Sequence, residues 1–153
     1  GDIVFIKKIL NEKNKKLATS KFNKDFFKKL ENKLKFVKCN LLTVKKIIVD
    51  KKEKLTLIKK FESVSVIDME AYYIKEELLK ANIPMASFKV IFDDLSFGIP
   101  SYITECINKK GELKKIKFLM KLILNPKRIF DLLEVNSKFS KSKKVLESLV
   151  NSF

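Results

Sequence analysis

Hydrophobic positions in the middle of the chain change from strand spacing to helical spacing and back. Val64, Val66 and Ile67 form a short apolar run, rich in β-branched residues, that is typical of a buried strand. Asp68 follows directly and can accept hydrogen bonds from the free N–H groups of a helix start. Apolar residues then recur at helical spacing across residues 71–80. The pattern therefore predicts a strand that leads straight into a helix.

The apolar stripe of this helix consists of Ala71, Ile74, Leu78 and Leu79. A second apolar run over residues 85–92 predicts another strand. So short a crossover between two strands implies that they are parallel neighbours.

Acidic residues follow both of these strands, at 68–70 and at 93–94. Ligands of parallel sheets bind at the carboxyl ends of the strands. We therefore expect the two acidic clusters to face one crevice.

The same two periods predict the remaining elements. Before the central region they predict a strand over 2–10, a polar turn over 11–16, a helix from 23 or 24 to 34, one long or two short strands over 36–49, and a helix over 52–61. After it they predict an irregular stretch over 95–110 with a short helix near 102–107, and helices over 114–124, over 128–135 and from 140 or 141 to 150. The chain is thus predicted to be one α/β domain over 1–153, with a mixed, largely parallel sheet flanked by helices.

Two motifs in this region resemble a known superfamily. Residues 67–71 (IDMEA) and 90–94 (VIFDD) resemble the C-terminal half of the purine nucleoside phosphorylases and nucleosidases. In that superfamily a (V/E)-(D/E)-M-E-(S/A) turn is followed by a strand that ends (I/V)-S-D. Residues 1–4 resemble a strand start of the same superfamily. One branch of the superfamily, the hopanoid-associated phosphorylases, acts on adenosylhopane. The chain resembles this branch in the order of three features: Asp93-Asp94, then Ile99-Pro100, then a basic helical tail.

The resemblance implies a partial phosphorylase fold that cleaves the N-glycosidic bond of an adenosine-like nucleoside and releases adenine. It implies that Asp93 donates a proton to the purine N7, that Glu70 binds the ribose hydroxyls, and that Met69 packs on the sugar or the base. As a proton donor, Asp93 needs a pKa raised by burial beside apolar side chains such as Phe92. Adenosylhopane is the favoured substrate and 5′-methylthioadenosine is the second.

The chain departs from the superfamily at two places in this expected site. Phe92 replaces the serine that precedes the catalytic acid. The aromatic residue that stacks on the purine should fall near Ile48, Val49 or Asp50, where no aromatic occurs. The resemblance still implies that Ile48, Val49 and Phe92 lie at the substrate, but the two departures weaken the expected recognition of the base.

A non-catalytic interpretation of the same residues stays open. An acid such as Glu70 is common at helix starts, and a pair such as Asp93 and Asp94 is common in turns and helix caps. The alternative function is a truncated nucleoside-binding remnant, or a basic module that binds membranes or nucleic acid. Because the chain begins with Gly1 rather than Met, we expect a fragment or a processed chain, with the superfamily's phosphate loop and N-terminal acid upstream. An edge of the sheet beside residues 2–10 should then be exposed or paired with another chain.

The composition of the chain disfavours several classes of partner and cofactor. The formal net charge is +16, but Arg128 is the single arginine among 34 basic residues, which disfavours a nucleic-acid reader. The chain has no histidine, and Cys39 and Cys106 have no metal-ligand spacing, so we expect no metal and no cofactor, with phosphate as a conceivable co-substrate. Unpaired cysteines suit a reduced, cytoplasmic protein.

The tail over residues 109–153 is basic and amphipathic. The predicted helix over 114–124 has one apolar face and one basic face. The apolar face consists of Ile116, Leu119, Met120 and Ile123, and the basic face of Lys114, Lys117 and Lys121. Such a helix either lies in a membrane surface or packs on its own sheet with the lysines in water. We expect a small-molecule nucleoside as the partner, and a lipid-linked one if the tail contacts the inner membrane. We also expect the chain to form a homo-oligomer.

Overall fold

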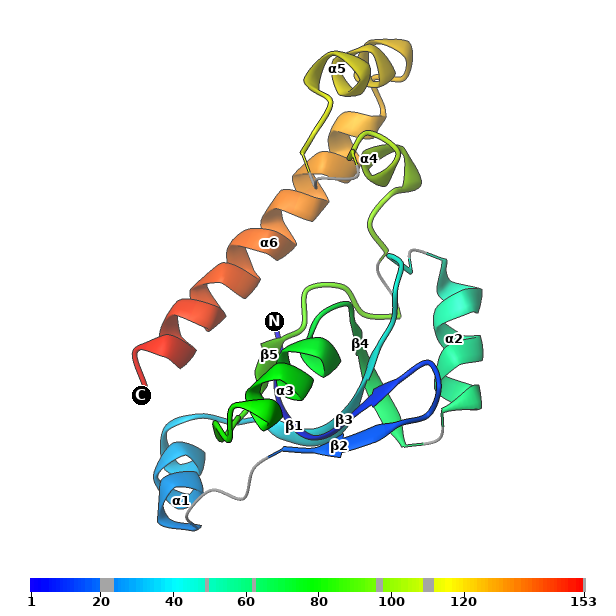
Figure 1. Cartoon of the computed structure of the whole chain (residues 1–153). Helices are drawn as coiled ribbons and strands as arrows, with labels where there is room; N and C mark the ends of the chain where they lie inside the picture. Colours follow the sequence, from blue (N-terminus) through cyan, green and yellow to red (C-terminus); the bar gives the residue numbers. More distant parts are fainter. Residues whose placement is uncertain (20–23, 49, 62, 96–97, 109–111, 153) are drawn as a thin grey trace.

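The computed structural model describes residues 1–19, 24–48, 50–61, 63–95, 98–108 and 112–152. Its strands and helices follow one another in this order: β1 (Ile3–Asn11), β2 (Lys16–Ala18), α1 (Lys24–Lys33), β3 (Val37–Thr43), α2 (Lys51–Lys60), β4 (Val64–Asp68), α3 (Ala71–Lys80), β5 (Phe88–Val90), α4 (Ser101–Thr104), α5 (Lys115–Leu124) and α6 (Arg128–Val150) (Figure 1). Most of these elements lie within a few residues of the predicted ones.

The strands form one mixed sheet with β1 near its centre. β3 runs parallel to β1 along most of its length, and β4 runs parallel to β3. The other edge of β1 is shared by two short antiparallel strands, with β5 beside Ile3–Phe5 and β2 beside Lys8–Leu10. A mixed sheet with flanking helices and a C-terminal helix confirms the predicted fold class.

Two predictions about strand neighbours are wrong. β4 and β5 are not parallel neighbours, because β5 runs antiparallel to β1, with β1 and β3 between it and β4. The connection over residues 81–87 makes this possible: three strand spacings measure about 14 Å, whereas seven extended residues reach about 23 Å. The strand over 2–10 also has partners on both edges, so among the described residues the edges without a partner strand are the outer edges of β4, β2 and β5.

The sheet buries a separate apolar cluster on each face. Neighbouring residues of one strand point to opposite faces, and accordingly Leu41 belongs to one cluster and Leu42 to the other. The first cluster includes Tyr72 of α3, and the second includes Phe61 at the end of α2. Helices α3 and α2 therefore cover opposite faces of the sheet.

Helix α3 buries a different face from the one that its apolar stripe predicted. Ala71, Tyr72 and Lys75 are buried, whereas Ile74 and Leu79 are about half exposed. The side-chain bonds that hold the first turn of α3 against the sheet, described below, decide which face turns inward.

The C-terminal helices form an arm that extends from the sheet (Figure 1). The two helices predicted over 128–135 and 140–150 are one continuous helix, α6, because residues 136–139 contain neither glycine nor proline to end it. The second half of α6 packs beside β5: the rings of Phe139 and Phe92 lie 6.2 Å apart, and Ser142 Oγ donates a hydrogen bond to the Ile91 carbonyl. The first half carries α4 and α5 away from the sheet.

Candidate functional site

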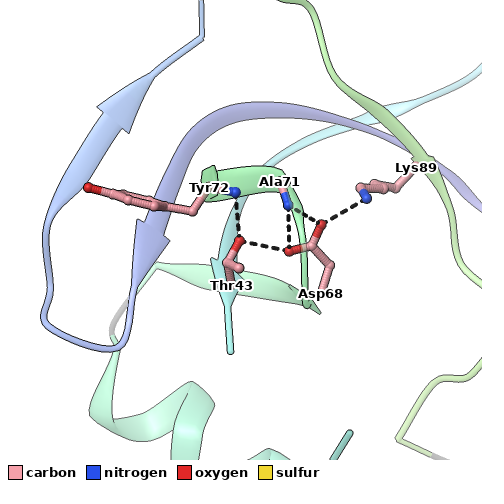
Figure 2. Close-up of polar contacts among 5 residues, drawn as sticks. All are labelled: Thr43, Asp68, Ala71, Tyr72 and Lys89. Carbon is pink, nitrogen blue, oxygen red and sulfur yellow. Dashed lines mark hydrogen bonds and ion pairs between the residues drawn. The ribbon is translucent and has the colours of Figure 1, made fainter. Parts of the chain in front are cut away.

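The carboxyl ends of β3 and β4 are joined by a small hydrogen-bond network (Figure 2). Thr43 Oγ1 donates to Asp68 Oδ1 at 2.7 Å and accepts from the Tyr72 backbone N–H at 3.0 Å. Asp68 Oδ2 accepts from the Ala71 N–H at 3.1 Å, which confirms that this carboxylate caps the helix start. The network ties the first turn of α3 to both strands.

Lys89 of β5 completes the network from across the sheet. Its Nζ lies 2.8 Å from Asp68 Oδ2, and the Asp68 side chain is only 10% exposed (Figure 2). A carboxylate that is nearly removed from water needs a cationic or hydrogen-bonding partner for each oxygen, and Asp68 has both. Asp68 thus serves to position the residues that follow it, Met69 and Glu70.

A second ion pair holds Asp93 against α2. Lys54 Nζ lies 2.5 Å from Asp93 Oδ2, with the lysine side chain 12% and the aspartate side chain 35% exposed. Asp50 caps α2 by accepting a hydrogen bond from the Glu53 N–H at 2.8 Å, so Lys54 extends from a well-defined first turn. Asp93 itself lies three residues beyond the end of β5, in the irregular segment that follows it.

One pocket brings the two acidic clusters together. It is an open groove with a volume of about 950 Å³, near the top of the range of about 300–1,000 Å³ typical of small-molecule sites. Its wall includes residues of both clusters together with their lysine partners, namely Asp68, Met69, Asp93, Asp94, Lys54 and Lys89. Four of the five acidic-cluster residues, Asp68, Met69, Asp93 and Asp94, thus share one pocket, although the strand arrangement differs from the predicted one.

The predicted site residues have different positions relative to this pocket. Ile48, Met69, Phe92 and Asp93 line it. Glu70 is exposed at the start of α3 and is not among the lining residues, and its side chain makes no capping hydrogen bond. Val49 lies outside the described residues. The roles of these side chains in binding and catalysis stay predictions.

Sequence reasoning missed the polar partners of the two carboxylates. Lys54 and Lys89 were not singled out, because lysine is spread along the whole chain and neither residue belongs to a local motif. Thr43 was missed because its role depends on β3 and β4 being neighbours. The predicted strand range over 36–49 includes Thr43, whereas β3 ends at this residue.

The pocket wall carries an acceptor and a donor side by side, Asp93 and Lys54. No group of three or more His, Cys, Asp and Glu side chains suited to a metal ion occurs in the described part of the chain. Cys39 also lines the pocket, but burial raises the pKa of its thiol more than the nearby Lys7 lowers it. A thiol with a raised pKa is a poor nucleophile near neutral pH. The charged groups of the wall include two ion pairs, Asp93–Lys54 and Asp68–Lys89.

Comparison with solved structures finds proteins of the same fold. Futalosine hydrolase of Helicobacter pylori superposes with a TM-score of 0.50 at 13% identity, and a mutant of it with 0.51 at 14%; each match covers 99% of this chain and 60% of that protein. A Campylobacter jejuni 5′-methylthioadenosine/S-adenosyl homocysteine nucleosidase superposes with a TM-score of 0.51 at 12% identity, over 97% of this chain and 60% of the nucleosidase. The sequence matches no protein-family model and no curated protein.

The structural similarity concerns the fold. Both proteins belong to the superfamily that the motifs at 67–71 and 90–94 resemble, and at these identities the match shows a shared partial nucleosidase fold. The chain spans about three fifths of the length of each.

Proposed function

We propose that the chain forms the sugar- and base-binding part of an enzyme that cleaves the N-glycosidic bond of a nucleoside. The observation that carries this proposal is the shared pocket. Two segments that resemble superfamily motifs, 67–71 and 90–94, contribute residues to one wall. The fold in which they do so is similar to that of a futalosine hydrolase and a nucleosidase.

The chemistry of bond cleavage matches the groups on the wall. Cleavage leaves negative charge on the departing base, and a positioned acid relieves it by protonating a ring nitrogen. We assign Asp93 to the base, Met69 to the sugar or base, and Ile48 and Phe92 to apolar contacts. Glu70 is assigned to the ribose hydroxyls, which requires a bound substrate that extends to the start of α3.

Lys54 adds a condition to the role of Asp93. In the ion pair Asp93 carries its negative charge, whereas a proton donor must be neutral. Two routes satisfy this condition. Either the substrate displaces the Lys54 ammonium and Asp93 binds the proton that it then donates, or the ammonium donates the proton while Asp93 orients it.

Adenine release tests the proposal. We expect Asp93→Asn to lower kcat by about 10²–10⁴-fold, the usual contribution of a general acid. Asp94→Asn is the matched control, because Asp94 lines the same pocket beside Asp93 and has no assigned role. Lys54→Gln separates the two routes: activity that survives this change assigns the proton to Asp93, and activity that disappears assigns it to Lys54. Equal rates for Asp93→Asn and Asp94→Asn would contradict the proposal.

The substrate panel identifies the group at the 5′ position. Adenosylhopane remains the favoured substrate from the sequence motifs, 5′-methylthioadenosine is second, and futalosine is included because a protein of the same fold hydrolyses it. Each is assayed with and without inorganic phosphate, which separates phosphorolysis from hydrolysis. A dependence of the rate on phosphate would make phosphate a co-substrate.

Binding is measured alongside turnover, because the chain spans only part of the length of the compared proteins. A ligand at one hundred times its Kd stabilises a folded protein by about 2.7 kcal/mol, so a thermal shift detects binding without catalysis. A nucleoside that stabilises the chain but is not cleaved supports the alternative, a non-catalytic binding module. No stabilisation and no cleavage with any of the three nucleosides would overturn both.

A further inference from the structure

The end of the C-terminal arm carries an apolar face that the described residues of the chain do not cover. On α5 the side chains of Ile116, Leu119, Met120, Ile123 and Leu124 are each more than half exposed, and those of Ile116 and Leu124 are about 80% exposed. At 3.6 residues per turn, these five side chains occupy one face of the helix. A run of large exposed apolar side chains of this kind marks an interaction surface.

A different face of α5 holds the helix to the arm. Phe118 and Leu122 are half-buried, and the Phe118 ring stacks on Tyr102 of α4 with the ring centroids 6.4 Å apart. Lys117 Nζ donates to the Glu105 carbonyl, and Lys121 pairs with the Glu105 carboxylate. The apolar face is therefore free to meet a partner while α5 stays attached.

The charges around this face favour an anionic partner. Between residues 113 and 130 the sequence contains six basic residues and no acidic one. Lys117, Lys121 and Arg128 make contacts within the arm, and the remaining three are Lys114, Lys115 and Lys127. Two such ends facing each other would bring these positive charges together, which disfavours a second copy of the chain. A nucleic acid would satisfy the lysines but would leave the apolar face in water.

A bilayer that contains anionic lipid satisfies both features. Apolar side chains of an interfacial helix insert about 5–10 Å into the boundary between headgroups and acyl chains. Lysine stems lie along the apolar surface while their ammonium groups reach the lipid phosphates. No described helix has the length and apolar composition that crossing a bilayer requires, so contact at the surface is the relevant mode.

We propose that α5 docks the protein on the surface of a membrane that contains anionic lipid, with the face formed by Ile116, Leu119, Met120, Ile123 and Leu124 inserted. The arm places this face away from the pocket, since α5 lies at the far end of the arm from the sheet (Figure 1). The proposal is independent of the reaction proposed above.

Vesicle sedimentation of the full chain tests the inserted face. We expect wild type to pellet with phosphatidylcholine vesicles that contain one quarter phosphatidylglycerol, and far less with phosphatidylcholine alone. Ile123→Asp should lower the partition coefficient at least tenfold. Ile74→Asp is the matched control, because it introduces the same charge at a half-exposed isoleucine on α3. Lys115→Gln and Lys127→Gln should each lower binding about fivefold at low salt.

A fluorescence probe tests the same face without adding charge. The chain has no tryptophan, so Leu119→Trp reports the surroundings of α5 alone. We expect its emission to shift to the blue on anionic vesicles, whereas Leu79→Trp on the exposed face of α3 should not shift.

Three results would overturn the proposal: no pelleting of wild type with anionic vesicles, equal pelleting of Ile123→Asp and Ile74→Asp, or an unshifted Leu119→Trp emission. A wild-type dimer in light scattering that Ile123→Asp dissociates would also overturn it, because the face would then join two copies. Circular dichroism of each variant verifies that α5 and α6 remain helical.

Discussion

The sheet and the C-terminal arm use the same kinds of apolar residue in opposite ways. In the sheet, Ile6, Leu41 and Leu42 are completely buried, whereas Ile116 and Leu124 of the arm are about 80% exposed. The sheet has a helix on each face to cover its apolar side chains. The arm has three helices that cover one another only in part. The difference teaches that the apolar residues of the sheet stabilise the fold, whereas many of those in the arm are available to a partner.

The polar groups of the two regions differ in the same way. Around the pocket, Thr43, Asp68 and Lys89 connect three strands and a helix in one network. In the arm, Tyr102 and Arg128 make the corresponding connection between α4, α5 and α6. The Tyr102 hydroxyl donates to the Arg128 carbonyl, the Arg128 guanidinium lies 4.7 Å from the Tyr102 ring centroid, and Arg128 Nη1 donates to the Lys121 carbonyl. Tyr102 and Arg128 thus link the three helices of the arm, in addition to the contacts of Glu105 with Lys117 and Lys121.

The largest expected change in the free energy of unfolding comes from truncating a buried leucine of the sheet, and an exposed leucine of the arm serves as the comparison. Leu41→Ala, at a fully buried position, should lower the free energy of unfolding by about 2–5 kcal/mol, because it removes apolar contacts and leaves a cavity. Leu119→Ala on α5 should change it by less than about 0.5 kcal/mol. Urea denaturation measures both. Similar losses for the two variants would show that α5 is covered in solution and would remove the contrast.

Thr43→Val should have an intermediate effect. The buried hydroxyl of Thr43 bonds both Asp68 and the Tyr72 N–H. Its removal takes the acceptor from the Tyr72 N–H and leaves Asp68 Oδ1 with the longer bond from the Ala71 N–H, at 3.4 Å. We expect a loss of about 1–3 kcal/mol. Thr56→Val is the control, because the exposed Thr56 hydroxyl bonds only the Lys52 carbonyl of its own helix. A Thr43→Val protein as stable as the Thr56→Val protein would mean that the network contributes little.

Tyr102→Phe should have the smallest effect, about 1 kcal/mol near neutral pH, because one hydrogen bond is lost. The difference in stability between wild type and Tyr102→Phe should also depend on pH. Burial raises the pKa of the Tyr102 hydroxyl, and the charge of Asp131 raises it further, although Arg128 lowers it in part. The contribution of the neutral hydroxyl is therefore fully present below the unfolded pKa of about 10 and is lost as pH rises through the folded pKa.

Thermal unfolding between about pH 8 and about pH 12 measures this difference. Lysine deprotonation affects both proteins alike, so we expect wild type to lose stability more steeply than Tyr102→Phe above about pH 10. Tyr72→Phe on α3, which packs against the sheet, is the comparison, because burial also raises the pKa of this tyrosine. Parallel pH profiles for wild type and Tyr102→Phe would show that the hydroxyl does not hold the arm.

Local patterns predicted most of the elements because hydrophobic period is a local property. The helices over 24–33, 51–60 and 115–124 and the strands over 3–11 and 64–68 all lie close to their predicted ranges. The order of strands in the sheet was harder to predict from the sequence. The segment over 81–87 is long enough to reach either edge, and only packing decides which one β5 joins. The prediction of a single domain over 1–153 stays a prediction.

The candidate site was predictable in part for the same reason. The acidic residues at 68–70 and 93–94 stand out in the sequence, and Met69 and Asp93 line a common pocket. Their lysine partners could not be found, because a contact between residues 54 and 93 or between 68 and 89 leaves no trace in either local pattern.

The sequence by itself determined the alternation of strands and helices, the capping role of Asp68 and the basic, apolar character of the tail, since each depends on residues close together in the chain. The tertiary structure alone decided the antiparallel placement of β5, the face of α3 that is buried, and the pairing of Asp93 with Lys54. It also decided which face of α5 stays uncovered. These features depend on which distant segments pack together, and the free energy of that packing is a property of the whole fold.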